Sequence, residues 1–258
     1  MTENDLPELD REDLLRRLPE IRKIEDEKLR EKTIDVFLNH CPSYFWTVPA
    51  SSSGKYHPQD TTGRHGLWLH SVRAFHAFQD LSRTEEEMGL IDEDELDYGR
   101  AAILLHDIFK QGLPPRDEHH TQKDHDRTAS EYLGRKTDLP DEVLGLVDSH
   151  NGAWNEGKEP ETELELLHHR ADYIVSRKKC YYEIPDPCEE LEQVIHERKT
   201  EEERKILDRV ASLKEASEAY TSVSEYVGDF TLPGQGGVDR EDLSKVIRYV
   251  RNGGESSQ

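Results

Sequence analysis

Apolar residues recur at intervals of three and four over most of the chain, which is the period of an α-helix. The pattern predicts helices over these ranges, the first interrupted by Pro19: 5–24, 26–41, 66–81, 128–135, 140–149, 161–177, 206–227 and 239–251. No convincing alternation of apolar and polar residues, the mark of a half-buried strand, occurs along the sequence. The sequence therefore predicts an all-α fold.

A further apolar run, residues 101–109, is interrupted by His106 and Asp107. The run is typical of a core helix, which Asp94 or Asp97 would cap. A buried carboxylate is costly without a counter-charge, a hydrogen-bond network or a metal. Lys110 lies four residues after His106 and three after Asp107, so all three side chains can face one pocket.

The remaining segments suggest how the chain is organised. A polar loop over residues 50–66 holds His57 and Arg64, which we predict as substrate contacts because long ordered loops often carry function. We predict N-terminal helices at 1–50 that pack on a core at 51–184. A C-terminal helical extension at 185–258 would join them in a single globular unit.

Composition narrows the class of protein. The chain has 34 basic and 56 acidic residues, a net charge of −22, which disfavours wrapping along nucleic acid but not small anions held by metal. The acidity fits a high-salt cytoplasm or simply an acidic protein. Three cysteines without CxxC spacing predict neither a disulfide framework nor a zinc ribbon. With no signal peptide and no apolar run near 20 residues, we expect a cytoplasmic protein without membrane contact.

Six potential metal ligands lie on or beside different predicted helices: His70, His106, Asp107, His125, His150 and Asp172. Each alone has an ordinary reading as a capping, core or ion-pair residue. Together they suit Mn, Fe, Co, Ni or Zn better than Mg. Two such ions about 3.5–4 Å apart would activate water and stabilise both the attacking and the leaving oxygen of a phosphoester. His125 is preferred to His119 and His120 because it leads directly into a helix. His168 and His169 are expected to form hydrogen bonds or face solvent.

The motifs around these residues resemble the HD superfamily of metal-dependent phosphohydrolases. The resemblance spans roughly residues 55–180 and rests on five segments in order: 66–71, 104–110, 125, 150–154 and 171–177. It implies an HD-domain helical bundle with extra terminal helices. It also implies that a single metal ion would be held by His70, His106, Asp107 and Asp172. In members of the family with two metal ions, His125 and His150 would be added for the second ion. Phe109 departs from the small residue common in the family.

The resemblance implies an enzyme that hydrolyses a phosphate ester of a nucleotide or a small phosphodiester through a metal-activated water. Asp107 and Lys110 are the expected catalytic residues, with Arg73 and Arg177 on phosphate oxygens. Two readings stay open beside it: a 3′–5′ exonuclease on single-stranded nucleic acid, and a sensor that binds metal and nucleotide without turnover. A small nucleotide is favoured over long nucleic acid as the partner, and homo-oligomerisation is left open.

Overall fold

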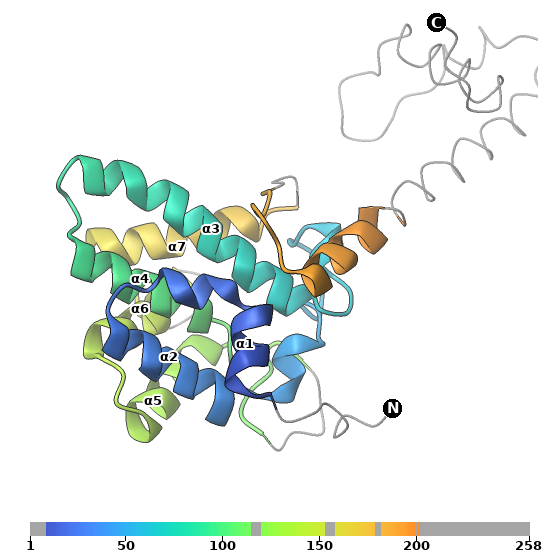
Figure 1. The fold of residues 1–258 in the computed structure, drawn as a ribbon, viewed down its shortest axis with the longest axis horizontal. Coiled ribbons are helices and arrows are strands. Elements are labelled where there is room, and N and C mark those ends of the chain that lie inside the picture. The colour runs from blue at the N-terminus through green and yellow to red at the C-terminus, as the bar shows by residue number, and fades with distance from the viewer. Residues whose placement is uncertain (1–8, 115–119, 153–157, 179–181, 200, 202–258) are drawn as a thin grey trace, which may run out of the picture. The chain divides into compact units, whose positions relative to one another are not determined.

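The computed structural model describes residues 9–114, 120–152, 158–178, 182–199 and 201. The chain divides into two compact units, 1–195 and 196–258. Up to residue 175, the described residues of the first unit form these α-helices and short 3-10 helices (Figure 1): α1 (Arg11–Arg17), η1 (Pro19–Lys23), α2 (Glu27–Asn39), η2 (Ser43–Trp46), η3 (Gln59–Thr61), α3 (Gly66–Glu87), α4 (Glu93–Leu105), α5 (His125–Lys136), α6 (Asp141–Ser149) and α7 (Glu163–Val175). No strand occurs in the described ranges, and the all-α prediction is confirmed.

Helices α3 and α7 run side by side, and α4 packs against α3, α6 and α7 (Figure 1). Helices α5 and α6 pair with each other. The N-terminal elements η1 and α2 pack on α4, and α1 packs on η1 and α2. One continuous apolar core joins the N-terminal elements to α3, and it includes Leu14, Ile21, Phe37, Trp46, Trp68 and Phe75. The division into segments 1–50, 51–184 and 185–258 remains a prediction.

The start of α4 differs from the expectation that Asp94 or Asp97 caps it. Asp92 is the N-cap, and it forms a capping box with Glu95. Asp97 is buried and accepts hydrogen bonds from the backbone N–H groups of Glu25 (3.0 Å) and Asp26 (2.6 Å). The carboxylate of Asp97 therefore holds the turn before α2 against α4, a contact that local spacing does not reveal.

Helix ends deviate from the pattern in three places. Helix α3 continues to Glu87 because its last turns are charged and exposed, so the apolar stripe stops before the helix does. Helix α5 begins at His125 and not at 128. Helix α4 ends at Leu105, and the residues after it form tight turns. The chain is helical again over 189–199, as expected after Pro185 and Pro187. The helices expected at 206–227 and 239–251 lie outside the described residues.

The polar loop is fixed to the start of α3 by a close backbone approach. A Cβ at Gly66 would lie 1.9 Å from the carbonyl oxygen of Thr61. That carbonyl also accepts a hydrogen bond from the N–H of Ala50 (2.9 Å). Glycine at the start of α3 therefore lets the loop lie directly on the helix, which places His57 beside α3.

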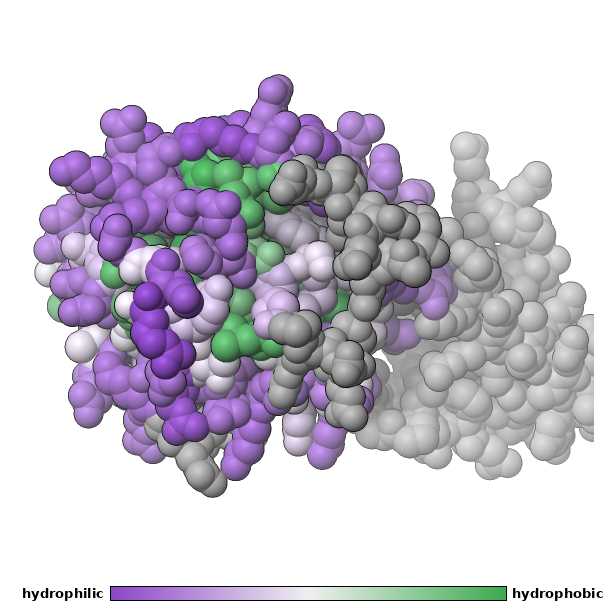
Figure 2. Space-filling view, turned by 90° about the horizontal axis from the view of Figure 1, so that it is seen from below, coloured by the Kyte–Doolittle hydropathy of each residue, from purple (hydrophilic) through white to green (hydrophobic). Residues whose placement is uncertain are grey.

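Hydrophilic residues cover most of the coloured surface in Figure 2, with small apolar areas between them. Among the described residues, no helix is long and apolar enough to cross a membrane.

Two helical glycines differ in the space around them. A Cβ at Gly99 in α4 would lie 2.1 Å from the Phe78 ring, whereas one at Gly145 in α6 would have its nearest neighbours at 3.8 Å. We expect Gly99→Ala to lower the free energy of unfolding by about 1–3 kcal/mol through overpacking. The control Gly145→Ala should raise it by up to about 1 kcal/mol through helix propensity. Urea unfolding measures both, and equal effects of the two substitutions would contradict this packing.

Candidate metal centre

The His106–Asp107 pair lies where α4 ends. His106 is the C-cap, and residues 106–112 form successive turns in which the N–H of Lys110 donates to the carbonyl of Asp107 (2.9 Å). The hydroxyl of Tyr44 donates to the carbonyl of Gly112 (2.7 Å) and so ties these turns to the N-terminal part of the chain. His106 and Asp107 are fully buried. The pair is thus held by backbone hydrogen bonds and by a distant tyrosine.

The first donor group consists of His70 from α3, His106 and Asp172 from α7, which together could hold a metal ion. The Nε2 atom of His70 lies 3.0 Å from Oδ1 of Asp172 and 3.3 Å from Nε2 of His106. Asp107 joins this group through Oδ2, which lies 3.3 Å from His70 Nε2 and 3.4 Å from His106 Nε2. Four ligand side chains therefore converge on one point.

The second donor group consists of Asp107, His125 and His150. Oδ1 of Asp107 lies 2.9 Å from Nε2 of His125 and 3.5 Å from Nε2 of His150. The two imidazole Nε2 atoms are 3.3 Å apart. Asp107 therefore presents one carboxylate oxygen to each donor group, the bridging arrangement expected of a two-ion centre.

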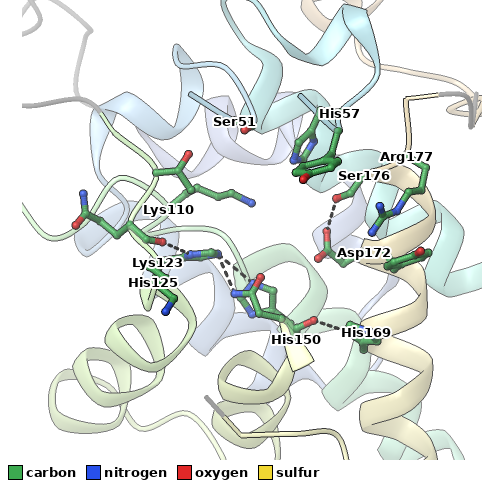
Figure 3. A pocket seen from close by; sticks show the side chains of 15 residues that line it. Ser51, His57, Lys110, Lys123, His125, His150, His169, Asp172, Ser176 and Arg177 are labelled. Carbon is green, nitrogen blue, oxygen red and sulfur yellow. Dashed lines mark hydrogen bonds between the residues drawn. The ribbon is translucent and has the colours of Figure 1, made fainter. Parts of the chain in front are cut away.

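Three of the four histidines are oriented in the same way. His106, His125 and His150 each donate Nδ1–H to the carbonyl three residues earlier, on Ile103, Gln122 and Val147 respectively, all at 2.7 Å. This bond leaves the Nε2 lone pair facing the donor group, as in metal-ligating histidines, whose second nitrogen is fixed by an outer partner. Figure 3 shows the bond to His125 and the approach of His125 and His150.

Buried carboxylates dominate the electrostatics of the centre. Burial by itself would raise the pKa of Asp107, but Lys110 and His106 hold that pKa well below its usual range. The pKa of Asp172 is likewise held low by His106 and His70 against the effect of burial. Burial would lower the pKa of His106, yet Asp107 and Asp172 raise it to about 10. The centre thus has a strong preference for positive charge.

The donor set fits divalent ions in spacing and chemistry. At metal–ligand bonds of about 2.1 Å, neighbouring ligands are about 3.0 Å apart in an octahedron and about 3.4 Å apart in a tetrahedron. The closest donor–donor distances here run from 2.9 to 3.6 Å. Oδ1 of Asp107 is buried and accepts no hydrogen bond within the described part of the chain. Imidazole and carboxylate donors without thiolate suit ions of intermediate hardness.

A cavity of about 310 Å³ opens onto both donor groups (Figure 3). Among the residues that line it are His125, His150, Asp172 and a set of aromatic and cationic side chains: Tyr56, His57, Lys110, Lys123, Tyr173 and Arg177. Lys110 donates to Oδ2 of Asp107 (2.6 Å), and the Arg177 guanidinium lies 3.7 Å from the ring centroid of Tyr173. Phe109 packs on Tyr132 and leaves Lys110 free to reach Asp107.

The structure places the other predicted substrate contacts differently. His57 lines the cavity, with its ring 5.1 Å from that of His70, and burial lowers its pKa to about 3. Arg73 is buried and forms a two-bond ion pair with Asp60 (2.9 and 2.5 Å), so its placement does not fit a phosphate contact. Arg64 is exposed and does not line the cavity. The local sequence pattern could not reveal that Arg73 pairs with Asp60 or that Arg64 faces solvent.

The other histidines named in the sequence analysis lie in three different environments. His119 lies outside the described residues, and His120 is exposed and away from both donor groups. The expectation of hydrogen bonding holds for His169, whose Nδ1–H donates to the carbonyl of His150 (2.6 Å). His168 does not face solvent: it is fully buried between the rings of Phe78 and His106, because α7 packs on α3 and α4 at this point.

Some residues of the site escaped sequence reasoning. The Ser176 hydroxyl donates to Oδ1 of Asp172 (3.2 Å), and the Asn151 amide lies 3.2 Å from His125 Nε2. Helical spacing of four residues from Asp172 could have indicated Ser176. Nothing local marks Asn151 or Tyr44, because their contacts depend on how distant segments meet.

The described residues form a helical domain with two groups of potential metal ligands at its centre, and Asp107 lies beside both groups. Residues 67–176 match the family model for the HD domain, a span that includes all six predicted ligands. This segment is therefore similar to the HD domain, as its motifs indicated. That superfamily consists generally of metal-dependent phosphohydrolases. No curated protein and no solved structure gave a significant match to the chain.

Metal stoichiometry tests the bridging geometry. We expect the protein to retain two divalent ions after dialysis against Mn²⁺ or Ni²⁺, and His150→Ala to retain one, because only the second donor group loses a ligand. Elemental analysis of protein without an affinity tag measures the ratio. The matched control is His120→Ala, which removes an exposed histidine outside both groups. Equal stoichiometry in wild type and His150→Ala would contradict the assignment.

The Arg73–Asp60 pair generates a stability prediction. Asp60→Asn leaves the buried guanidinium without its counter-charge and should lower the free energy of unfolding by about 3–5 kcal/mol. The double variant Asp60→Leu with Arg73→Met should recover most of that loss. Glu131→Gln, which disturbs an exposed pair with Arg135, is the control and should change stability by less than about 0.5 kcal/mol. A negligible effect of Asp60→Asn in urea unfolding would contradict this structural role of the ion pair and leave Arg73 available as a substrate contact.

Proposed function

We propose that this protein is a metal-dependent hydrolase of phosphate esters, acting on a nucleotide or a small phosphodiester. The observation that carries the proposal is Asp107, whose two buried oxygens approach separate donor groups at 2.9 and 3.3 Å. Two bound ions would act as Lewis acids on the phosphoryl group and lower the pKa of water. The six residues that would hold them are His70, His106, Asp107, His125, His150 and Asp172.

The cavity supplies the remaining requirements of such a reaction. Lys110, Lys123 and Arg177 line it, although the chain as a whole carries a net charge of −22. A local group of cations in an acidic protein favours a compact anion over a long polyanion, because the field of the whole surface repels the latter. We infer that Lys110 contacts a phosphoryl oxygen and offsets its charge, since its ammonium already lies beside Asp107.

A 3′–5′ exonuclease is the second candidate. Two partly exposed tyrosines, Tyr56 and Tyr173, line the same cavity and could stack on bases of a single strand. Shortening of a labelled oligonucleotide from its 3′ end would favour this candidate over a small substrate. Binding of metal and nucleotide without turnover of any ester would instead favour the sensor.

Hydrolysis of bis-p-nitrophenyl phosphate and p-nitrophenyl phosphate tests the proposal. We expect the protein loaded with Mn²⁺, Co²⁺ or Ni²⁺ to hydrolyse the diester. The double variant His125→Ala with His150→Ala should lose at least about a hundredfold in kcat/KM, because one ion supplies several kcal/mol of transition-state stabilisation. His120→Ala should keep wild-type activity. Metal bound at full stoichiometry with no hydrolysis of either ester would refute the enzymatic reading.

A further inference from the structure

A second pocket adjoins the cavity of the metal centre. Its volume is about 380 Å³, and it shares two lining residues with the first pocket, Ser51 and His57. The polar loop supplies most of its wall, and Lys178 follows the end of α7. The two pockets therefore meet at His57, directly beside the first donor group.

His57 is the wall between the two pockets. Its side chain is buried with 8% exposure, and its ring centroid is 5.1 Å from that of His70. Its Nδ1 atom is buried and has no hydrogen-bond partner within the described segments. Buried polar atoms in native proteins are nearly always satisfied, so this nitrogen requires a partner that the described segments do not supply.

The two pockets differ in chemistry. The first presents the rings of Tyr56 and Tyr173, which are 49% and 41% exposed and suit a flat aromatic group. The second presents hydroxyl, amide and ammonium groups, which suit a sugar or a further phosphate: Ser51, Ser52, Ser53, Gln59, Thr62 and Lys178. A single substrate that filled both would carry a base on one side of its phosphoryl group and a polar sugar on the other.

The loop that forms the second pocket is fixed in place. The Ser52 hydroxyl lies 3.2 Å from that of Thr121, and the N–H of Thr121 donates back to the Ser52 hydroxyl (3.3 Å). Thr121 itself lines the first pocket. Gly54 turns the loop at a φ of 57°, a conformation that favours glycine. The hydrogen bonds between Ser52 and Thr121 therefore fix the loop that separates the two pockets.

We propose that the substrate is a phosphodiester of nucleosides that spans both pockets, with its phosphoryl group at the junction and His57 in contact with it. One nucleoside stacks in the first pocket, and the sugar of the other occupies the second. Hydrolysis breaks one P–O ester bond, forms a P–O bond to the oxygen of water, and releases one arm as an alcohol that carries a proton from water. This proposal rests on the proposed function and specifies its substrate.

Ligand binding tests the two-pocket arrangement separately from turnover. The ligands are a dithymidine phosphorothioate, which is hydrolysed slowly, and thymidine 5′-monophosphate, titrated calorimetrically into the Mn²⁺-loaded protein. Ser53→Tyr fills the second pocket, and Ser53→Ala is its matched control. We expect Ser53→Tyr to raise Kd for the dinucleoside ligand by about tenfold or more while Kd for the mononucleotide stays unchanged, and Ser53→Ala to leave both within about threefold.

His57→Gln and His57→Ala add a kinetic readout. On dithymidine monophosphate, His57→Ala should lower kcat/KM by about tenfold or more, and His57→Gln, whose amide can still donate a hydrogen bond to the phosphoryl group, should lower it by less. Equal losses in the alanine and glutamine variants would indicate a structural role and overturn the contact. Equal Kd values for the dinucleoside ligand in wild type and Ser53→Tyr would overturn the second subsite even if hydrolysis is found. Absence of turnover with the Kd difference intact would refute only the proposed function.

Discussion

The buried carboxylate of Asp107 is the constraint on which the rest of the structure depends. It is fully buried, and each oxygen approaches a different set of imidazoles. An unpaired charge in such a place would be strongly destabilising, so positive groups must surround it. Lys110 and His106 provide that charge within the protein, and the geometry of the donors would let divalent ions provide it also.

The positions of the ligands follow from where helices begin and end. His106 and His150 are the C-cap residues of α4 and α6, and His125 is the first residue of α5. These histidines use Nδ1–H to satisfy carbonyls of the adjoining turn, and the same hydrogen bond orients Nε2 toward its donor group. His70 lies near the start of α3 and Asp172 in the last turn of α7, and these two helices pack side by side. A rigid framework thus fixes the donors.

Charge is distributed unevenly between the surface and the site. The chain carries a large acidic excess, yet the cavity at the metal centre is lined by Lys110, Lys123 and Arg177. The acidic surface disfavours long polyanions, and the local cations favour a small one. The N-terminal helices contribute to the site indirectly, since Tyr44 anchors the turns that come after His106. The N-terminal segment, which the sequence marks only as packing helices, therefore supports the turns beside the two donor groups.

The sequence by itself determined the helical class, most of the helices and the six side chains that meet at the centre. The spacing of apolar residues follows the period of the helix, so it can be read from the sequence. Polar residues such as His106 and Asp107 are conspicuous because they interrupt an apolar run. Only the tertiary structure decided that Arg73 pairs with Asp60, that His168 is buried and that Asp97 caps a turn before α2. These outcomes depend on which side chains of distant segments come together, and no local pattern encodes that meeting.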